Sequence, residues 1–262
     1  MKSGEIISNR QLHGDYFRID FRAPEIAGHA EPGQFVHVRI DQRADNMLRR
    51  PFSIFNAEDG VLSIVYKVVG VGTRRLSQLR PGTVCDIIGP RGRGFSAPPA
   101  GVIPVAVCGG YGSAALYMMT RRGRGVLLLG ARNAQEVILA NEYAEAGFEV
   151  RIATNDGSLG TRGFVTELIE PLLAENPAGR FFFYGCGPGP MLRALAIKLR
   201  SLGLDGELSV DEIMCCGVGA CFGCVVKVND REAETGWSYA RSCVEGPVFR
   251  LDEIYIDGEG EC

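Results

Sequence analysis

A group of cysteines near the C-terminal end of the sequence has the spacing of an iron–sulfur site. Cys216, Cys221 and Cys224 form a C-x4-C-x2-C pattern, and Cys243 supplies a distant fourth thiol. This spacing is typical of plant-type [2Fe–2S] centres, in which four thiolates hold two irons. Cys215 is adjacent, but only Cys216 gives the required spacing. The pattern predicts Cys216, Cys221, Cys224 and Cys243 as metal ligands, and electron transfer as the chemistry.

Glycines within the same stretch fit a loop that wraps around a cluster. Gly217, Gly219 and Gly223 allow tight turns and let backbone N–H groups face the sulfur atoms. The alternatives are a zinc site or ordinary buried cysteines. Zinc sites usually use two close C-x2-C pairs, and Cys216 and Cys243 have no such close partners.

An arginine-containing segment in the first part of the chain is suited to phosphate binding. In residues 50–53, Arg-Pro-Phe-Ser, the guanidinium can bind a phosphate while the serine lies near a ring system. The alternative is that Arg49 and Arg50 are simply solvated. Further on, residues 66–69 lead into a glycine turn, and backbone N–H groups at Gly72 and Thr73 favour a pyrophosphate. A plain helix cap is the alternative for that pair.

Two glycine-rich turns in the middle of the chain follow predicted strands. Gly109, Gly110 and Gly112 lie between a strand and a helix, and residues 185–188 form a second turn of this kind. Loops at the carboxyl ends of parallel strands bind ligands, and glycine lets the backbone approach a phosphate. Such turns also occur for packing reasons alone. Asp156 follows another strand and can accept hydrogen bonds from ribose hydroxyls, or it can simply form an Asp-Gly turn.

The elements that must position these residues fall into three zones. Residues 1–100 contain short strands separated by Pro-Gly and Asp-Gly turns, which predicts a small antiparallel β-barrel. Residues 101–208 alternate strands and helices, which predicts a doubly wound parallel sheet. Residues 209–262 are rich in Gly and Cys and too few to form a good core without the cluster. The predicted helices cover residues 73–79, 113–121, 136–147, 163–173 and 191–202.

Composition narrows the classes of function. The chain has 262 residues, a net charge of −3 and 46% hydrophobic residues, so neither nucleic acid nor a membrane is an expected partner. No apolar run has the length of a membrane span, and the N-terminus lacks the layout of a signal peptide. We therefore expect a cytoplasmic protein. Nine cysteines there indicate metal or redox use rather than disulfides.

Taken in order, these motifs resemble a known family. The Arg-Pro-Phe-Ser segment, the turn at 109–112, T-N-D-G-S at 154–158, G-C-G-P-G-P-M at 185–191 and the four-cysteine loop are similar to the electron-transfer subunit of heteromeric, NAD-linked dihydroorotate dehydrogenase. That family belongs to the ferredoxin–NADP-reductase-like flavoproteins. The resemblance covers essentially the whole chain, and its most specific parts are residues 154–166, 216–224 and 242–249.

The resemblance implies FAD between the barrel and the second domain, NAD(H) on the second domain, and a [2Fe–2S] cluster facing a catalytic, FMN-containing subunit in a heterotetramer. It implies electron flow from dihydroorotate to NAD⁺, in pyrimidine biosynthesis. The residues implied at FAD are Arg50, Pro51, Phe52, Ser53, Tyr66, Lys67, Val68, Gly72 and Thr73. Those implied at the nicotinamide nucleotide are Gly109, Gly110, Gly112, Gly185, Cys186, Gly187 and Pro188.

Three residues depart from the family pattern. Cys108 stands where glycine is usual, Ala115 where proline is frequent, and Cys215 where alanine is common. Cys85 and Cys262 have no interpretation beyond a strand residue and a free terminus. No basic patch lies near the expected ribose site, which favours NAD over NADP, although Arg132 and Arg162 could reverse this.

Two other classes of function compete. The first is a subunit of another complex, such as a bifurcating ferredoxin–NADP transhydrogenase, a sulfide dehydrogenase or a hydrogenase. The intact Cys243 and the Gly-Pro-Val-Phe sequence at 246–249 favour the dihydroorotate system. The second is a redox-sensing or structural metal-binding module without turnover. No acid–base pair is visible, and the three histidines, His13, His29 and His37, are expected at the surface or in turns.

Overall fold

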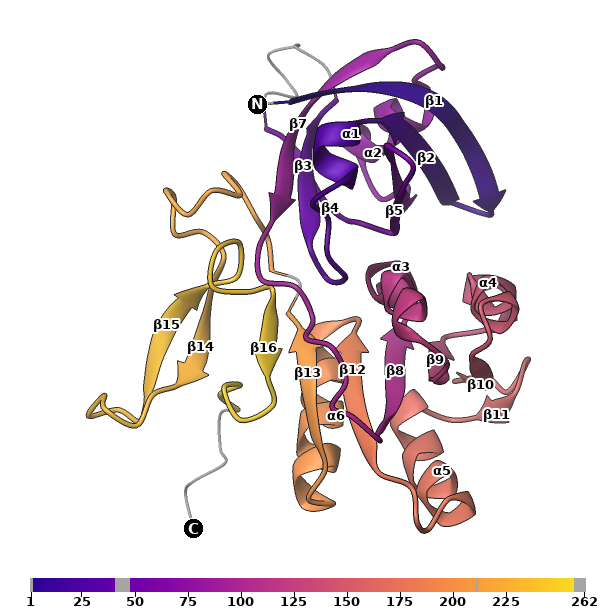
Figure 1. Cartoon of the computed structure of the whole chain (residues 1–262), viewed down its shortest axis with the longest axis vertical. Coiled ribbons are helices and arrows are strands. Elements are labelled where there is room, and N and C mark those ends of the chain that lie inside the picture. The colour runs from indigo at the N-terminus through magenta and orange to yellow at the C-terminus, as the bar shows by residue number, and fades with distance from the viewer. Residues whose placement is uncertain (1, 41–47, 211, 257–262) are drawn as a thin grey trace.

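The structure is a computed structural model, and it describes residues 2–40, 48–210 and 212–256. Its N-terminal part is an antiparallel barrel with the strand order β4-β3-β7-β1-β2-β6-β5 (Figure 1). Alternating apolar residues of these strands point inward and form one core, which includes Ile19, Val36 and Ile64. The elements are β1 (Lys2–His13), β2 (Tyr16–Arg22), α1 (Pro24–Ala27), β3 (Phe35–Arg39), β4 (Arg50–Ser53), β5 (Asn56–Glu58), β6 (Val61–Lys67), α2 (Val71–Ser77) and β7 (Val84–Arg91).

The second part is a seven-stranded sheet with the order β11-β10-β9-β8-β12-β13-β16, and all of its pairs are parallel except β13 with β16. Its elements up to the last parallel strand are β8 (Ile103–Gly109), α3 (Gly112–Leu116), η2 (Tyr117–Arg122), β9 (Val126–Ala131), η3 (Ala134–Glu136), α4 (Ala140–Glu145), β10 (Glu149–Thr154), β11 (Thr161–Arg162), η4 (Val165–Leu168), α5 (Ile169–Glu175), β12 (Phe181–Cys186), α6 (Gly189–Ser201) and β13 (Asp205–Ser209).

Helices cover both faces of this sheet, as the alternation of strands and helices predicts. One face packs against α3, η2 and α4 and also meets barrel residues such as Phe55 and Phe95. The other face packs against η4, α5 and α6. The barrel is joined to the sheet domain through this first face, where the rings of Phe55 and Tyr117 stack at a centroid distance of 4.4 Å.

The cysteine-rich segment returns to the same sheet. Strands β14 (Val225–Asn229) and β15 (Trp237–Arg241) form a separate two-stranded sheet, whereas β16 (Val248–Arg250) pairs antiparallel with β13. The yellow segment in Figure 1 therefore lies beside both the barrel and the edge of the larger sheet. The predicted domain boundary between residues 208 and 209 falls inside β13.

Several elements differ from the sequence expectation. Strand β1 was not among the predicted strands, because its second half, from Ser8 to Gln11, is polar and hides the alternation. The helix predicted over 136–147 is reduced to α4, since Leu139 takes a left-handed φ of 62° just before it. The helix predicted over 113–121 becomes a short α-helix followed by a 3₁₀ segment. Among the described residues, no helix is long and apolar enough to cross a membrane.

Candidate functional site

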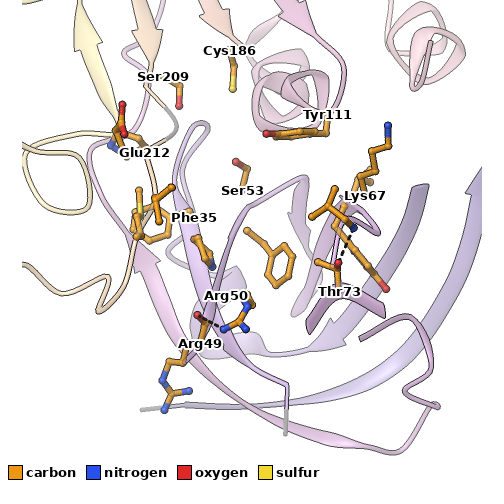
Figure 2. A pocket seen from close by; sticks show the side chains of 18 of the residues that line it. Phe35, Arg49, Arg50, Ser53, Lys67, Thr73, Tyr111, Cys186, Ser209 and Glu212 are labelled. Carbon is orange, nitrogen blue, oxygen red and sulfur yellow. Dashed lines mark hydrogen bonds between the residues drawn. The ribbon is translucent and has the colours of Figure 1, made fainter. Parts of the chain in front are cut away.

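A pocket of about 580 Å³ lies where all three parts of the chain meet. Its size is within the range of small-molecule sites, roughly 300–1,000 Å³. Figure 2 shows Ser53 from the barrel and Tyr111 and Cys186 from the sheet domain pointing into it. The lining residues are Phe35, Leu48, Arg49, Arg50, Pro51, Phe52, Ser53, Val65, Tyr66, Lys67, Val69, Thr73, Tyr111, Cys186, Ser209, Glu212, Ile213, Met214 and Pro247.

Most of the barrel residues assigned to the flavin line this pocket. Strand β4 supplies residues 50–53, and β6 supplies Tyr66 and Lys67 from the neighbouring wall. Val68 differs, because it packs against the barrel core and is not among the lining residues. The Tyr66 ring lies edge-on to Phe52, with their centroids 5.7 Å apart. Their packing gives the pocket an apolar wall suited to a flat ring system.

One end of the pocket carries a guanidinium held close to a glycine backbone. Arg50 donates a hydrogen bond from Nη1 to the Leu48 carbonyl, at 2.5 Å. A Cβ added to Gly72 would lie 3.0 Å from Arg50 Nε, so the absence of a side chain lets the guanidinium lie against the start of α2. Thr73 Oγ1 accepts hydrogen bonds from the N–H groups of Val69 and Gly70, at 2.9 and 3.2 Å. The helix-cap interpretation of this turn is thus seen directly, and binding of a phosphate there stays a prediction.

The two glycine-rich turns lie against each other at the carboxyl ends of β8 and β12. A Cβ on Gly112 would be 2.2 Å from the Cys186 carbonyl oxygen, and one on Gly109 would be 2.9 Å from Pro188 Cδ. A Cβ added to Gly187 would lie 3.0 Å from the Gly109 nitrogen. Close backbone packing therefore accounts for these glycines, and their contact with a nucleotide stays a prediction. Gly185 packs beneath Leu208 and Leu195, below the turn.

Asp156 lies in an exposed turn after β10. Its Oδ1 accepts hydrogen bonds from the backbone N–H and the hydroxyl of Ser158, at 2.9 and 2.6 Å. These hydrogen bonds lower the pKa of the carboxyl group. The turn-forming interpretation of the Asp-Gly pair is thus seen directly. Binding of a ribose by Asp156 stays a prediction.

The cysteine loop directs backbone N–H groups at a sulfur atom. Burial opposes ionisation of Cys216, but hydrogen bonds from Val218, Cys221 and Ala220 outweigh it and lower the pKa of this thiol to about 6. Gly219 has a φ of +83° and lets the loop curl in this way. Thiolates are the form that binds iron. This arrangement supports Cys216 rather than the exposed Cys215 as a ligand.

Two of the other predicted ligands, Cys224 and Cys243, are buried. Cys224 and Cys243 form a small core with Phe35 and Met214. Burial, together with the nearby Cys224, raises the pKa of Cys243 to about 11. Neighbouring thiolates repel, so a cation must offset their charge. In the described part of the chain no three His, Cys, Asp or Glu side chains gather around one ion site. A two-iron cluster instead divides four thiolates between two irons.

The expectation for the histidines is wrong for His37. His13 and His29 are exposed, but His37 is fully buried on β3 and contacts Gly217 of the cysteine loop. Burial, together with the charges of Arg49 and Arg91, lowers the pKa of His37 to about 4. The ring is therefore neutral at pH 7. Alternation along β3 could have placed His37 opposite the barrel core, but no local pattern indicates what covers that face.

Sequence reasoning also missed part of the pocket. Phe35, Met214 and Glu212 line it, although none carries a motif. Tyr111 lies between two glycines and is 48% exposed, and a bulky aromatic residue in such a turn was a usable signal. Of the cysteines without a role, Cys85 and Cys108 are buried, and burial raises the pKa of both thiols. Cys262 lies outside the described residues.

Comparisons with known proteins agree with this arrangement. The family model of the iron–sulfur cluster binding domain of dihydroorotate dehydrogenase B matches residues 211–255. The dihydroorotate dehydrogenase B (NAD(+)) electron transfer subunit of Desulforamulus reducens is 39% identical over 240 residues, covering 89% of this chain and 90% of the relative. The subunit of the same name from Bacillus caldolyticus is 42% identical over 235 residues, covering 86% and 87%.

Solved structures share the fold. A structure described as an NADH-dependent reduced ferredoxin–NADP oxidoreductase, studied for flavin-based electron bifurcation, has a TM-score of 0.83 and 29% identity and covers 97% of this chain and 90% of its own. A ferredoxin NADP⁺ reductase from Neisseria gonorrhoeae with bound FAD and NADP has a TM-score of 0.62 and 16% identity, covering 77% of this chain and 91% of its own. At that identity only the fold is shared.

Arg50→Ala should weaken FAD retention. Removing a charged hydrogen-bond donor to a phosphate costs about 1.5–3 kcal/mol, which corresponds to roughly ten- to hundredfold weaker binding. Flavin content after purification and titration of the apoprotein with FAD measure this. Arg22→Ala is the control, because Arg22 is an exposed barrel residue that does not line the pocket, and its flavin content should match the wild type. Equal flavin content in Arg50→Ala and the wild type would contradict the assignment.

Gly112→Ala should separate the two glycine-rich turns. The new methyl group would collide with the Cys186 carbonyl, and overpacking of this kind costs about 1–3 kcal/mol. We expect a melting temperature lower by about 2–4 °C for each kcal/mol, and weaker NADH binding. Thermal unfolding and NADH titration measure both. Gly189→Ala, whose Cβ would meet nothing within 4 Å, should leave both unchanged. Normal stability of Gly112→Ala would refute the packing argument.

Cys216→Ser should lose the iron–sulfur cluster, whereas Cys215→Ser should keep it. Cys216 accepts hydrogen bonds from the backbone N–H groups of Val218, Ala220 and Cys221, whereas Cys215 is exposed. Visible absorbance and the iron and sulfide content of anaerobically purified protein distinguish the two variants. The reverse pattern, with the cluster lost only from Cys215→Ser, would shift the ligand assignment by one residue.

Proposed function

This chain belongs to the family of dihydroorotate dehydrogenase B (NAD(+)) electron transfer subunits, and we propose that it carries electrons between a catalytic dihydroorotate dehydrogenase subunit and NAD⁺. Family membership rests on relatives 35–42% identical to it over most of both chains. The reaction serves pyrimidine biosynthesis. FAD and a [2Fe–2S] cluster are the cofactors.

The observation that carries the proposal is a shared wall between the pocket and the cysteines. Phe35 and Met214 both line the pocket, and the same two side chains form a buried core with Cys224 and Cys243. A ring system in the pocket and a cluster in the loop would therefore be separated by only one layer of side chains. Short separation is what electron transfer between two bound cofactors requires.

The residues of this chain supply position and charge, and the cofactors supply the redox chemistry. When bound, FAD would supply hydride exchange with NAD(H) and single-electron exchange with the cluster. Arg50 and the start of α2 would hold the phosphates, and Ser53, Phe52 and Tyr66 would hold the ring. Tyr111 and Cys186 face Ser53 from the sheet domain, where the nicotinamide must approach (Figure 2).

A carboxylate next to the expected ribose site supports NAD rather than NADP. Arg132 follows β9 and donates two hydrogen bonds to Glu136, at 2.8 and 2.5 Å. Glu136 also pairs with Lys67 of the barrel at 3.4 Å. These hydrogen bonds and charges lower the pKa of Glu136 and keep it ionised. A 2′-phosphate would meet this carboxylate, so NAD(H) is the better-matched nucleotide.

The surface around the cysteine loop suits a protein partner. Val218 is 44% exposed and Phe222 is 62% exposed, although both are apolar. Exposed apolar side chains that gather in this way mark interaction surfaces. We place the FMN-containing catalytic subunit there, within a heterotetramer in the cytoplasm, where thiols stay reduced. By function, residues 1–100 bind FAD, 101–208 bind NAD(H) and 209–262 hold the cluster.

Co-purification with the catalytic partner under anaerobic conditions tests the function. Dihydroorotate-dependent reduction of NAD⁺ should require both subunits. Cys224→Ser should lose this activity but keep NADH-dependent reduction of an artificial dye, because the flavin pocket does not need the cluster for hydride exchange. The wild-type complex and each separate subunit are the controls.

Two results would contradict the proposal. One is NAD⁺ reduction by the partner alone. The other is an intact flavin and cluster with dye reduction, but without dihydroorotate turnover in the complex. That second result would assign the chain to a different electron-transfer complex, such as the bifurcating oxidoreductases that share its fold.

A further inference from the structure

His37 is buried between the barrel and the cysteine loop. It lies on β3, in register with Pro51 of β4 and Ile88 of β7. Val36 and Val38 point into the barrel core, so Phe35 and His37 point out of it. The Phe35 and His37 rings are 5.6 Å apart with an interplanar angle of 62°. The exposed fraction of His37 is nevertheless 0%, because the cysteine segment covers this face.

The imidazole edge that carries Nε2 lies against the backbone of the cysteine loop. A Cβ added to Gly217 would be 2.7 Å from both Cε1 and Nε2 of His37, and 2.8 Å from Cδ2. Gly217 also has a φ of +65°, which favours glycine. Gly217 is the residue immediately after Cys216. The ring nitrogen is thus held next to a predicted ligand of the cluster.

Neither ring nitrogen of His37 has a hydrogen-bond partner among residues 2–40, 48–210 and 212–256. An unpaired buried donor or acceptor costs about 1–3 kcal/mol. A neutral imidazole has one N–H donor and one acceptor nitrogen. A sulfur atom of a cluster bound through Cys216, the residue before Gly217, would supply a hydrogen-bond acceptor on this side of the ring.

We propose that His37 is a positioning residue of the iron–sulfur site, and that its Nε2–H donates a hydrogen bond to a sulfur atom at the cluster beside Gly217. This rests on the proposed function, because it needs the cluster to be present. Hydrogen bonds to the sulfur atoms stabilise the more negative, reduced state and so raise the reduction potential. His37 thereby sets the driving force for electron transfer between the flavin pocket and the cluster in the cysteine loop. It is not a ligand, since four cysteines complete the set.

The experiment compares the wild-type holoprotein with His37→Leu and His37→Gln under anaerobic conditions. Leucine removes the N–H donor and fills the buried position with an apolar side chain, whereas glutamine keeps an N–H donor there. We expect His37→Leu to show a lower midpoint potential of the cluster in a redox titration followed by EPR, and His37→Gln to restore part of the shift. His13→Leu, at an exposed position, should leave the potential unchanged.

Selective ¹⁵N labelling of histidine gives a second measurement that does not depend on activity. Pulsed EPR of the reduced wild-type cluster should show coupling to a histidine nitrogen, and this coupling should vanish in His37→Leu but persist in His13→Leu. If His37→Leu fails to retain a cluster, the coupling in the wild type and in His13→Leu still decides the question.

The outcomes separate this inference from the proposed function. A wild-type cluster without histidine coupling, together with equal potentials in all variants, would overturn the role of His37 and leave the electron-transfer function intact. The absence of any [2Fe–2S] signal from the wild-type holoprotein would instead overturn the proposed function itself.

Discussion

Strand β3 is buried on both faces, and it connects the pocket to the cysteine loop. Its inward face, with Val36 and Val38, belongs to the barrel core. Its outward face carries Phe35 against Cys224 and Cys243, and His37 against Gly217. A one-residue shift in register would turn His37 into the barrel core and Val36 and Val38 out of it. The pocket and the cysteine loop are therefore held at a fixed separation by one strand of five residues.

The cysteine segment depends on the rest of the molecule for its order. It is too small for a substantial core of its own. Strand β16 anchors it to β13, and Arg93 pairs with Glu253 at 2.9 Å to tie its end to the barrel side. Gly92 allows Pro247 to approach closely, since a Cβ there would lie 2.5 Å from Pro247 Cδ. These contacts anchor the base of the segment, while Cys215, Cys221 and Phe222 of its loop stay exposed.

Local sequence patterns predicted most of the architecture but few of the contacts that join its parts. Cysteine spacing, Pro-Gly turns and strand–helix alternation are set by neighbours in the chain, so they can be read directly. The burial of His37, the return of β16 to the sheet and the position of Met214 depend on pairing between residues far apart in sequence. The glycines of the two turns were identified, yet Gly112 packs against the Cys186 carbonyl and Gly109 against Met191 and Pro188 of the other turn.

The return of β16 also determines the order in which the protein can be completed during synthesis. Domains fold from the N-terminus as the chain emerges, so the barrel and strands up to β13 are made first. The edge of β13 then stays unpaired until residues 248–250 leave the ribosome, and the four cysteines are made in between. Until β16 pairs, the larger sheet stays open at one edge beside the cysteine segment, so closure of the sheet and ordering of that segment are linked steps of folding.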